Sequence, residues 1–468
     1  MLGLTGLVLA RCLPERRADL APEPATPAPA LFASAPDDAL PATTRYEVAP
    51  GDSLGTIAAR FGTSVDALMR LNGLANADAI FIGQTLELRI EPERDGPDVR
   101  SLPDSELVNG PAYRDFDVAR FLTGQPGRLS AQQELVDGVA MSGPEIVARI
   151  AREFSVGPRA LLAFVEARSG QVSGMGDATM VDYPAGLVDP ARSGLWLQLS
   201  WLADRLNGGY YDLKTRGNRV ASTRDGVHLG APAGMNPGSF AVLRALALQS
   251  SEAELPGHLA AFDAAYRRLF GDPWAAALPA LDLATLSFPA LSLPWPAEER
   301  WWMTGGPHGG WADGSAWAAL DFVPPGEERG CFVAEASVTA VADGLVVAGG
   351  EGEIWLDLDG DGDRRTGPAI QYLHLAAEGR AAPGSRVAVG DPLGHPSCEG
   401  GVSNATHLHF SRSYDGEWLA AAGKAPTLLG GWRAWGAGIP YDGGLQHADG
   451  RRREACECRL EGQNDVGP

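Results

Sequence analysis

The sequence predicts a multi-domain protein with a small βααβ module, a mostly α middle domain and an all-β C-terminal domain. At 468 residues the chain is too long for one hydrophobic core. Helical periodicity fills the middle of the chain, whereas Pro, Trp and Gly followed by short alternating strands fill the last third. The expected parts are a signal-like start with a linker (1–44), the small module (45–90), the helical domain (100–290), the β domain (291–430) and an irregular tail (431–468).

The composition is that of a globular protein with many turns. Hydrophobic residues make up 45% and charged residues 21%, and the chain holds 59 glycines and 35 prolines. The net charge of -21 argues against nucleic acid as a partner, and the one basic run, at residues 451–453, is interpreted as a solvated tail. No stretch reaches the length of a transmembrane helix, and a monomer is expected.

The first 44 residues are interpreted as an export signal followed by a spacer. Residues 1–10 are apolar and resemble the end of a signal peptide whose first residues are missing. Cys12 follows, so a lipid anchor through Cys12 is an alternative, although Arg11 stands where lipoprotein signals carry a small residue. Pro and Ala dominate residues 13–44, a composition that stays extended. We therefore expect a secreted or cell-surface protein.

The cysteines agree with export. Cys331 and Cys398 both lie in the domain that holds five of the eight histidines, while Cys456 and Cys458 form a Cys-x-Cys pair. With Cys12 left over, this pattern fits an exported protein with one or two disulfides. The pair we expect is Cys331–Cys398.

Residues 45–90 predict a strand, two short capped helices and a returning strand. The motifs Tyr-x-Val-x-x-Gly-Asp-Ser-Leu, Leu-x-x-Leu-Asn-Gly-Leu and Ile-x-x-Gly-Gln-x-Leu together resemble a LysM module from end to end. That resemblance implies binding of N-acetylglucosamine chains in peptidoglycan or chitin. The alternative is a small domain whose Asp-Ser turn only caps a helix. The implied glycan groove is lined by Gly51, Asp52, Ser53, Leu54, Asn76, Ala77, Ile80 and Phe81.

The middle domain is expected to be helical, with capped helices opening at Ser130 and Ser142. Residues 156–170 faintly resemble the catalytic helix of lysozyme-like lytic transglycosylases, which carry Glu directly before Ser-Gly. Arg168 occupies that place here, and Glu166 lies two residues earlier, roughly 200° away around a helix. We therefore expect a packing or substrate-positioning domain, with a glycosidase that uses Glu166 as the alternative.

The stretch His407-Leu408-His409 places two histidines on one face of a predicted strand. Together with His308, Asp321 and His374 it resembles the lysostaphin-type zinc endopeptidases over residues 305–420. The resemblance implies one catalytic zinc ion held by His308, Asp321 and His409. It also implies that His407 carries the proton of the attacking water. His374, with Tyr372 nearby, would stabilise the oxyanion.

One departure from that family concerns the spacing of the first two ligands. Twelve residues separate His308 from Asp321, whereas the family uses a shorter segment. The segment is rich in Gly, Ala and Trp, so it can loop out and return Asp321 on a strand, and Asp313 is the substitute ligand if Asp321 is too far. The histidines outside this set are expected to be ordinary ones: His395 is placed in a loop, and the sequence around His228, His258 and His447 offers no motif that would make them ligands.

An acidic run with the pattern Asp-x-Asp-Gly-Asp-Gly-Asp offers a second set of cation ligands. Carboxylates that alternate with glycines can wrap calcium. Counted from Asp357, the twelfth position is Pro368, where an EF-hand requires Glu. Calcium is therefore considered but not favoured over a solvated acidic turn. The residues concerned are Asp357, Asp359, Asp361 and Asp363.

These expectations combine into an exported zinc-dependent endopeptidase that cuts peptide bonds of peptidoglycan and is tethered to the glycan by its LysM module. The main alternative is a non-catalytic cell-wall-binding regulator of other hydrolases, since some relatives of this fold lose zinc ligands. Here every ligand position is filled, which favours the enzyme.

Overall fold

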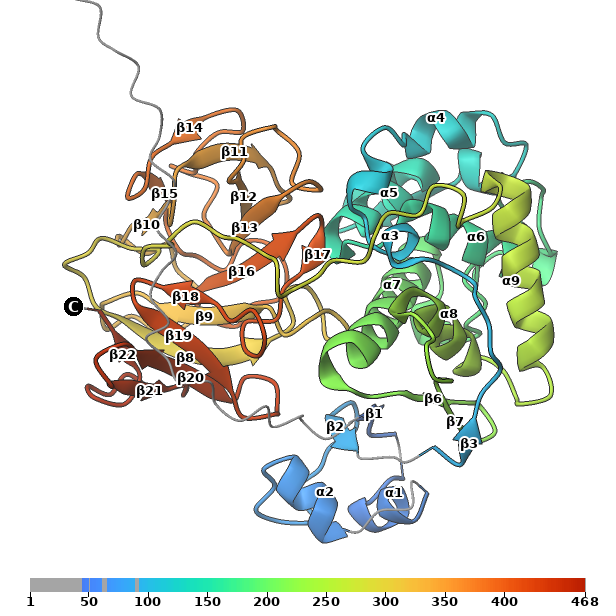
Figure 1. The fold of residues 1–468 in the computed structure, drawn as a ribbon, viewed down its shortest axis with the longest axis horizontal. Helices are drawn as coiled ribbons and strands as arrows, with labels where there is room; N and C mark the ends of the chain where they lie inside the picture. The colour runs from blue at the N-terminus through green and yellow to red at the C-terminus, as the bar shows by residue number, and fades with distance from the viewer. Residues whose placement is uncertain (1–43, 50, 61–64, 89–91, 468) are drawn as a thin grey trace, which may run out of the picture. The chain divides into compact units, whose positions relative to one another are not determined.

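The computed structural model describes residues 44–49, 51–60, 65–88 and 92–467, all within one compact unit, Ala39–Pro468 (Figure 1). The expected signal-like start, the linker and Cys12 lie outside the described residues. Within them the expected fold class is confirmed: a βααβ module, a mostly α domain and a β-rich C-terminal part follow one another. None of the described helices combines the length and the apolar character needed to span a membrane.

The first module is held together by two paired strands and two short helices. The strands run antiparallel with Tyr46 opposite Leu86. Leu54, Ile57 and Leu68 pack beneath them with almost no exposure. The elements are β1 (Thr44–Glu47), α1 (Leu54–Arg60), α2 (Val65–Leu71) and β2 (Thr85–Leu88).

The middle part, called here the helical domain (residues 92–290), is built around long buried helices. Its capping follows the sequence: the Ser142 hydroxyl accepts from the Glu145 N–H, and the Glu145 carboxylate accepts from the Ser142 N–H. The main helices are α3 (Asp104–Leu107), α4 (Val118–Thr123), α5 (Gly143–Phe154), α6 (Pro158–Ser169), α7 (Leu195–Tyr211), α8 (Pro237–Ala247) and α9 (Leu255–Phe270). A small sheet joins β3 (Arg94–Asp95), β7 (His228–Gly230) and β6 (Val220–Ser222).

The helix expected to open at Ser130 is wrong. The chain makes one 3-10 turn at Arg128–Ala131 and then a hairpin of β4 (Gln133–Val136) and β5 (Val139–Ser142). Asp137 and Gly138 form its two-residue turn with φ of 53° and 80°. An Asp-Gly pair with both residues at positive φ is the turn that closes a tight hairpin, and it overrides the local helix-capping pattern.

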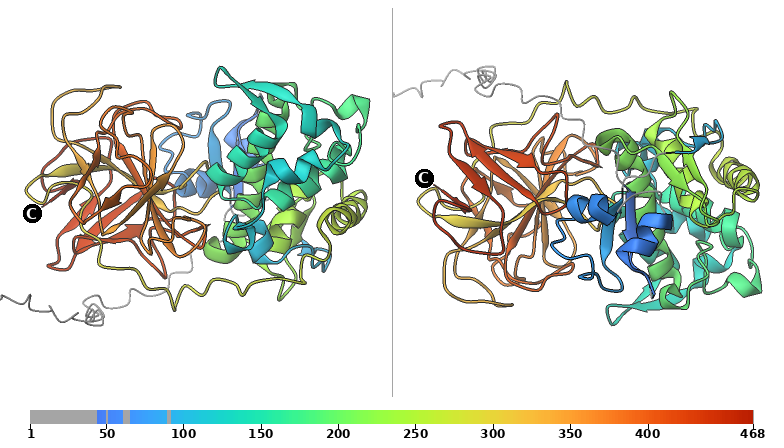
Figure 2. Two further views of the ribbon diagram at one scale, coloured as in Figure 1. Left: turned by 90° about the horizontal axis from the view of Figure 1, so that it is seen from above. Right: turned by 90° about the horizontal axis from the view of Figure 1, so that it is seen from below.

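The C-terminal part, called here the third module (residues 291–467), is organised by one large sheet. Its strands follow the order β14-β11-β12-β13-β16-β9-β8-β22, with β17 paired to β16. In both views of Figure 2 these yellow to red strands stay together as one body. The strands are β8 (Trp301–His308), β9 (Ala319–Val323), β11 (Gly344–Ala348), β12 (Glu353–Asp357), β13 (Pro368–Leu373), β14 (Arg386–Val387), β16 (Leu408–Tyr414), β17 (Glu417–Trp418) and β22 (Asp465–Val466); β10 (Val338–Thr339) and β15 (Pro392–Gly394) pair separately.

The irregular tail expected at residues 431–468 is wrong. A second sheet joins β18 (Leu428–Leu429), β19 (Trp432–Gly436), β20 (Gly443–His447) and β21 (Arg452–Glu454), and β22 closes the large sheet beside β8. Trp432 and Val466 are almost fully buried. The pairing of Val466 with Trp301 joins residues far apart in sequence, so local periodicity carried little sign of it.

The helical domain and the third module share one hydrophobic core. Ala316, Ala318, Trp355 and Trp418 belong to the cluster of buried side chains formed by the helices. The Trp418 N–H also donates to the Tyr211 hydroxyl at 2.9 Å. The two parts are therefore packed as one body rather than joined only by chain.

Candidate metal centre

Three neighbouring strands bring the predicted ligands together. His308 is the last residue of β8, Asp321 lies in the middle of β9, and His409 lies near the start of β16. Asp321 stands directly opposite His409 in the ladder and opposite Gly305 on the other side. A Cβ at Gly305 would lie 2.6 Å from Asp321 Oδ2, so glycine leaves the room that the carboxylate occupies.

The ligand atoms converge on one carboxylate oxygen. Asp321 Oδ1 lies 3.3 Å from His308 Nε2 and 3.2 Å from His409 Nδ1, and these two nitrogens are 3.2 Å apart. All three side chains are buried. The expected reach of Asp321 across the long loop is therefore confirmed, and Asp313 is not part of this group of atoms.

The outer nitrogens of the two histidines are held by backbone carbonyls. His308 Nδ1 lies 2.8 Å from the Gly306 oxygen, and His409 Nε2 lies 3.2 Å from the Gly310 oxygen. A carbonyl only accepts, so the hydrogen of each ring sits on that nitrogen. The lone pairs of His308 Nε2 and His409 Nδ1 then face Asp321.

This arrangement fits a metal ion. Asp321 Oδ1 is buried and, among the described residues, no donor makes a hydrogen bond to it. Lone pairs that face one another inside a protein repel unless a cation lies between them. Two imidazoles and one carboxylate form a three-ligand set of the kind that holds catalytic zinc with a position left for water. The outer carbonyls supply the orienting bonds that such ligands need.

The pKa values of the group follow from burial and mutual contact. Burial raises the pKa of Asp321, but His308 and His407 outweigh it and hold that pKa well below its ordinary value. Burial lowers the pKa of His308, yet the Asp321 carboxylate more than offsets this and raises it. Burial, aided by the neighbouring His407 and His409, lowers the pKa of His374 to about 3. His374 is therefore a neutral imidazole at neutral pH.

Two further histidines face the same centre. His407 Nε2 lies 3.6 Å from Asp321 Oδ1, and the rings of His407 and His374 are 4.4 Å apart. The outer Nδ1 of each ring meets a carbonyl: Ala405 for His407 at 2.8 Å and Glu399 for His374 at 3.2 Å. These contacts orient both rings, and His407 Nε2 is the nitrogen that faces Asp321.

The expectation that Tyr372 lies on the same face as His374, next to the metal centre, is wrong. Tyr372 is fully buried in β13, packs against Phe410 in the sheet core, and its oxygen accepts from the Val341 N–H at 2.9 Å. His374 follows the strand with φ of 66°, so the alternation that put both residues on one face ends before it.

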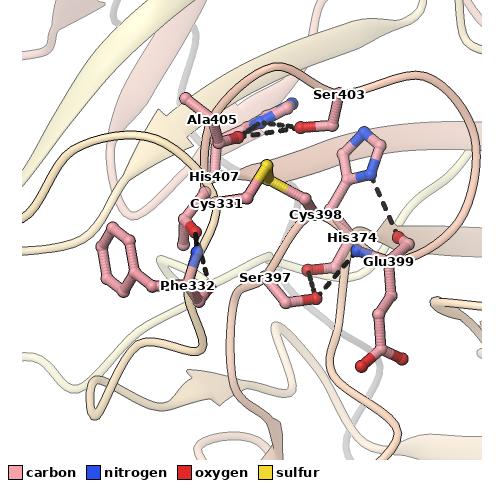
Figure 3. Close-up of a disulfide and its surroundings, with 10 residues drawn as sticks. Cys331, Phe332, His374, Ser397, Cys398, Glu399, Ser403, Ala405 and His407 are labelled. Atoms are coloured by element: carbon pink, nitrogen blue, oxygen red, sulfur yellow. Dashed lines mark hydrogen bonds between the residues drawn. A yellow bond between two sulfur atoms is a disulfide. The ribbon is translucent and has the colours of Figure 1, made fainter.

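The expected disulfide Cys331–Cys398 is confirmed and lies beside this site (Figure 3). The residues next to Cys398 hold His374, because the Ser397 N–H donates to the His374 carbonyl at 2.6 Å and the Glu399 carbonyl accepts from the ring. Phe332 follows Cys331, and its N–H donates to the hydroxyl of Thr406, which directly precedes His407. Cys456 and Cys458 form a second disulfide.

The metal centre opens into a cavity of about 1120 Å³. Its lining includes all five site residues and Tyr441, which sequence reasoning missed. The Tyr441 ring stacks on His308 at 4.2 Å with 16° between the planes. Its N–H donates to the Pro307 carbonyl at 3.0 Å, and its φ is 68°. No sequence signal marked it, because it lies in the segment expected to be irregular.

Glu166 has a very different setting. Its side chain is 4% exposed, and its oxygens accept from the N–H groups of Val172 and Ser173, from the Ser173 hydroxyl and from Arg268. Burial raises the pKa of Glu166, but these bonds outweigh it and lower that pKa. A glycosidase acid needs a raised pKa, so the structure does not support the proposed use of Glu166 as a catalytic acid.

The acidic run forms a turn stabilised by its own backbone. Asp357 is fully buried and accepts from the N–H groups of Asp359, Gly360 and Gly362. Ligand atoms of Asp357, Asp359 and Asp361 lie within 4.8 Å of one another. Asp363 lies outside that group and pairs with Arg365 at 2.7 Å. The preference for a solvated acidic turn over a calcium site therefore stays a prediction.

The predicted glycan residues of the first module divide into two kinds. Phe81 is 68% exposed and free to contact a ligand. Leu54 is 1% exposed, so its side chain belongs to the core and only its backbone can contribute. Asp52 accepts from Tyr46 and from the Ala49 N–H, which also gives it a role within the turn.

Comparisons with known proteins match separate parts of the chain. Residues 46–89 match the LysM domain family, and residues 100–284 match the family described as LasA, N-terminal domain. The LysM resemblance is therefore confirmed. The faint lysozyme-like resemblance of the middle domain is replaced by the LasA N-terminal match.

The chain is also similar to curated and solved proteins. It is 26% identical over 291 residues to Protease LasA of Pseudomonas aeruginosa strains UCBPP-PA14 and PAO1, covering 58% of this chain and 66% of each relative. The chain thus spans slightly under two thirds of those relatives. The solved structure of pseudoalterin, an M23 metalloprotease from the deep sea, is 23% identical with a TM-score of 0.31, over 36% of this chain and 96% of that one. The catalytic domain of lysostaphin from Staphylococcus simulans is 22% identical with a TM-score of 0.19, over 27% of this chain and 95% of that one.

Proposed function

We propose that this chain is an exported zinc endopeptidase that hydrolyses peptide bonds of peptidoglycan and is held on that substrate by its LysM module. The proposal extends to this chain the activity named for its relatives, Protease LasA and the peptidase lysostaphin. One observation carries it: the buried Asp321 Oδ1 lies 3.2 to 3.3 Å from one ring nitrogen of His308 and one of His409, while a backbone carbonyl holds the other nitrogen of each ring.

His308, Asp321 and His409 would hold the zinc ion. When bound, zinc lowers the pKa of a coordinated water toward neutrality and polarises the scissile carbonyl. The Gly306 and Gly310 carbonyls fix the ring orientation of His308 and His409, which keeps the two nitrogens aimed at the shared position.

His407 would accept the proton of the attacking water at Nε2 and return it to the leaving amine. Its Nδ1 hydrogen is engaged by the Ala405 carbonyl, so Nε2 is the available basic atom. His374 has the same tautomer, with Nδ1 held by the Glu399 carbonyl. In that tautomer His374 Nε2 accepts hydrogen bonds, so we assign it the orientation of the water rather than the oxyanion role expected from the family.

A non-catalytic regulator is the less favoured alternative. Such a protein would lack one or more ligands, whereas here the ligand atoms of His308, Asp321 and His409 lie within 4.8 Å of one another. His407 Nε2 also lies 3.6 Å from Asp321 Oδ1, and His374 lines the same cavity. A glycosidase that uses Glu166 is disfavoured by the lowered pKa of that carboxyl.

The LysM module and the disulfides support the cellular setting. Binding to glycan raises the local concentration of an insoluble substrate around the peptidase. Two disulfides fit an oxidising, extracytoplasmic environment. The proposal includes a monomeric chain that is secreted or held at the cell surface, with a lipid anchor at Cys12 as the alternative to free secretion.

Digestion of purified peptidoglycan tests the proposal directly. A peptidase releases new amino groups, whereas a glycosidase releases new reducing ends. We expect amino groups only, and about one zinc ion per chain by metal analysis of the full protein. New reducing ends without amino groups, or a folded chain that takes up no zinc, would overturn the proposal. His395→Ala is the matched control, because His395 lies in the same module but outside the cavity.

A further inference from the structure

The loop that joins two of the proposed ligands is the starting point. Residues 309–318, called here the ligand loop, connect His308 at the end of β8 to the first residue of β9. The Gly310 carbonyl in this loop accepts from His409 Nε2 at 3.2 Å. The position of the loop therefore affects all three proposed ligands. His308 and Asp321 are connected by it along the chain, and His409 is hydrogen-bonded to it.

The ligand loop is folded back on itself. The Trp311 N–H donates to the Ser315 hydroxyl at 3.0 Å, and the Gly310 N–H donates to the Ala316 carbonyl at 3.1 Å. Ala312 has φ of 53°. A displacement at the tip of such a compact loop is passed on to the Gly310 carbonyl.

The tip is held by the helical domain. Asp204, in α7, accepts from the Gly314 N–H through Oδ1 at 2.5 Å, and its Oδ2 pairs with Arg205 at 2.7 Å. A Cβ at Gly314 would lie 1.9 Å from the Asp204 carbonyl oxygen, so the approach requires glycine. The Arg216 guanidinium donates to the Ser315 carbonyl at 3.2 Å.

The helical domain also reaches the cavity wall. Phe154, at the end of α5, meets the Trp311 ring edge-on at 6.4 Å, and both residues line the cavity together with Asp204. The cavity that would receive the peptide is thus bounded by side chains of both domains.

We propose that the helical domain helps to position the metal ligands. In this proposal Asp204 is a positioning residue that holds the ligand loop and, through the Gly310 carbonyl, the ring of His409. This proposal rests on the proposed metal-dependent function of the same site. Orienting bonds to metal-bound histidines are typically worth about 10- to 100-fold in metal affinity, so losing the anchor of such a bond is measurable.

The alternative is that Asp204 only adds interface stability. Another contact between the same two domains provides the control: the Ser155 hydroxyl donates to the Gly416 carbonyl at 2.5 Å, and neither residue belongs to the ligand loop. Ser155→Ala removes an interdomain hydrogen bond but none of the hydrogen bonds that hold the ligand loop. A purely structural role for Asp204 predicts that both variants behave alike.

The test uses the full chain loaded with Co²⁺, which takes the same nitrogen and oxygen ligands as Zn²⁺ and absorbs visible light according to their geometry. Asp204→Ala is expected to change the Co²⁺ spectrum and weaken Co²⁺ binding by about 10-fold or more. Asp204→Asn keeps an acceptor for the Gly314 N–H and should restore most of both. Ser155→Ala should lower the melting temperature while leaving the spectrum unchanged.

An Asp204→Ala spectrum and affinity equal to those of the unaltered protein would overturn the proposal, and so would equal changes in Ser155→Ala. If Asp204→Ala does not fold, Trp311→Ala takes its place, because Trp311 is half-buried in the same loop. Co²⁺ binding needs no peptidoglycan. An unaltered protein that binds Co²⁺ but releases no amino groups would therefore fail the proposed function alone, whereas one that binds no Co²⁺ would fail both.

Discussion

Two buried carboxylates, Asp321 in the third module and Glu166 in the helical domain, differ in whether their oxygens already have hydrogen-bond donors. Glu166 accepts from two backbone N–H groups, a hydroxyl and a guanidinium. Asp321 Oδ1 lies 3.2 to 3.3 Å from ring nitrogens of His308 and His409 and has no hydrogen-bond donor among the described residues. Burial is common to both, so burial alone marks neither as functional. The informative difference is the unmet bonding capacity at Asp321.

The largest expected effect separates the two sites by activity. His409→Ala removes one of the three ligands and should lower amino-group release from peptidoglycan by roughly 1000-fold or more, because the remaining two ligands cannot hold a catalytic zinc. Glu166→Gln should leave the rate within about twofold. The measurement is the initial rate of amino-group release, and a comparable loss in both variants would erase the distinction between the sites.

Removal of the metal should lower the unfolding free energy through the Asp321 site and not through the Glu166 site. Zinc at 1000 times its dissociation constant stabilises the folded state by about 4 kcal/mol, so a chelator should lower the unfolding free energy by that amount. The denaturant midpoint with and without chelator reports it. The chelator effect should vanish in His409→Ala and persist in Glu166→Gln, and an effect that persists in both would place the metal elsewhere.

Glu166→Gln should cost about 2 kcal/mol of stability, because an amide cannot accept all the bonds that a buried carboxylate accepts. Equilibrium unfolding of this variant beside the unaltered protein measures the loss. His395 lies in a loop and bonds the Ala336 carbonyl, and His395→Ala is expected to lose less unfolding free energy than Glu166→Gln. A stable Glu166→Gln variant would mean that the bonds around Glu166 contribute little.

The smallest effect is the pH dependence of that loss. Because the folded pKa of Glu166 is lowered, its contribution is fully present above the unfolded pKa of about 4.3 and declines as pH falls toward the folded value. The stability difference between Glu166→Gln and the unaltered protein should therefore shrink below about pH 4. A difference that grows on acidification would contradict the assigned direction.

The ligand set could be predicted because its signals are local. Two histidines two apart share a strand face, and Asp321 stands between apolar neighbours, as in a buried strand. The strand context favoured Asp321 over Asp313 as the ligand, and the structure places Asp321 Oδ1 3.2 to 3.3 Å from nitrogens of His308 and His409.

What could not be predicted depends on contacts between distant segments. Tyr441 reaches His308 only because a second sheet folds back over the first, and the strands of that sheet are short. The contact of Asp204 with Gly314 joins residues 110 positions apart and has no periodic signature. Tyr372 was misplaced because the backbone leaves the strand at His374, where φ is positive.

The disulfide Cys331–Cys398 makes the structure around the site depend on the redox conditions in which the chain folds. It closes a segment of 67 residues that contains His374, and cross-linking a loop of this size restricts the unfolded chain by about 4 kcal/mol. In a reducing compartment the backbone segments that carry the carbonyls behind His374 and the hydroxyl beside His407 would lack this tie. The segments that support His374 and His407 are therefore tied together only where the surroundings are oxidising enough to keep this disulfide.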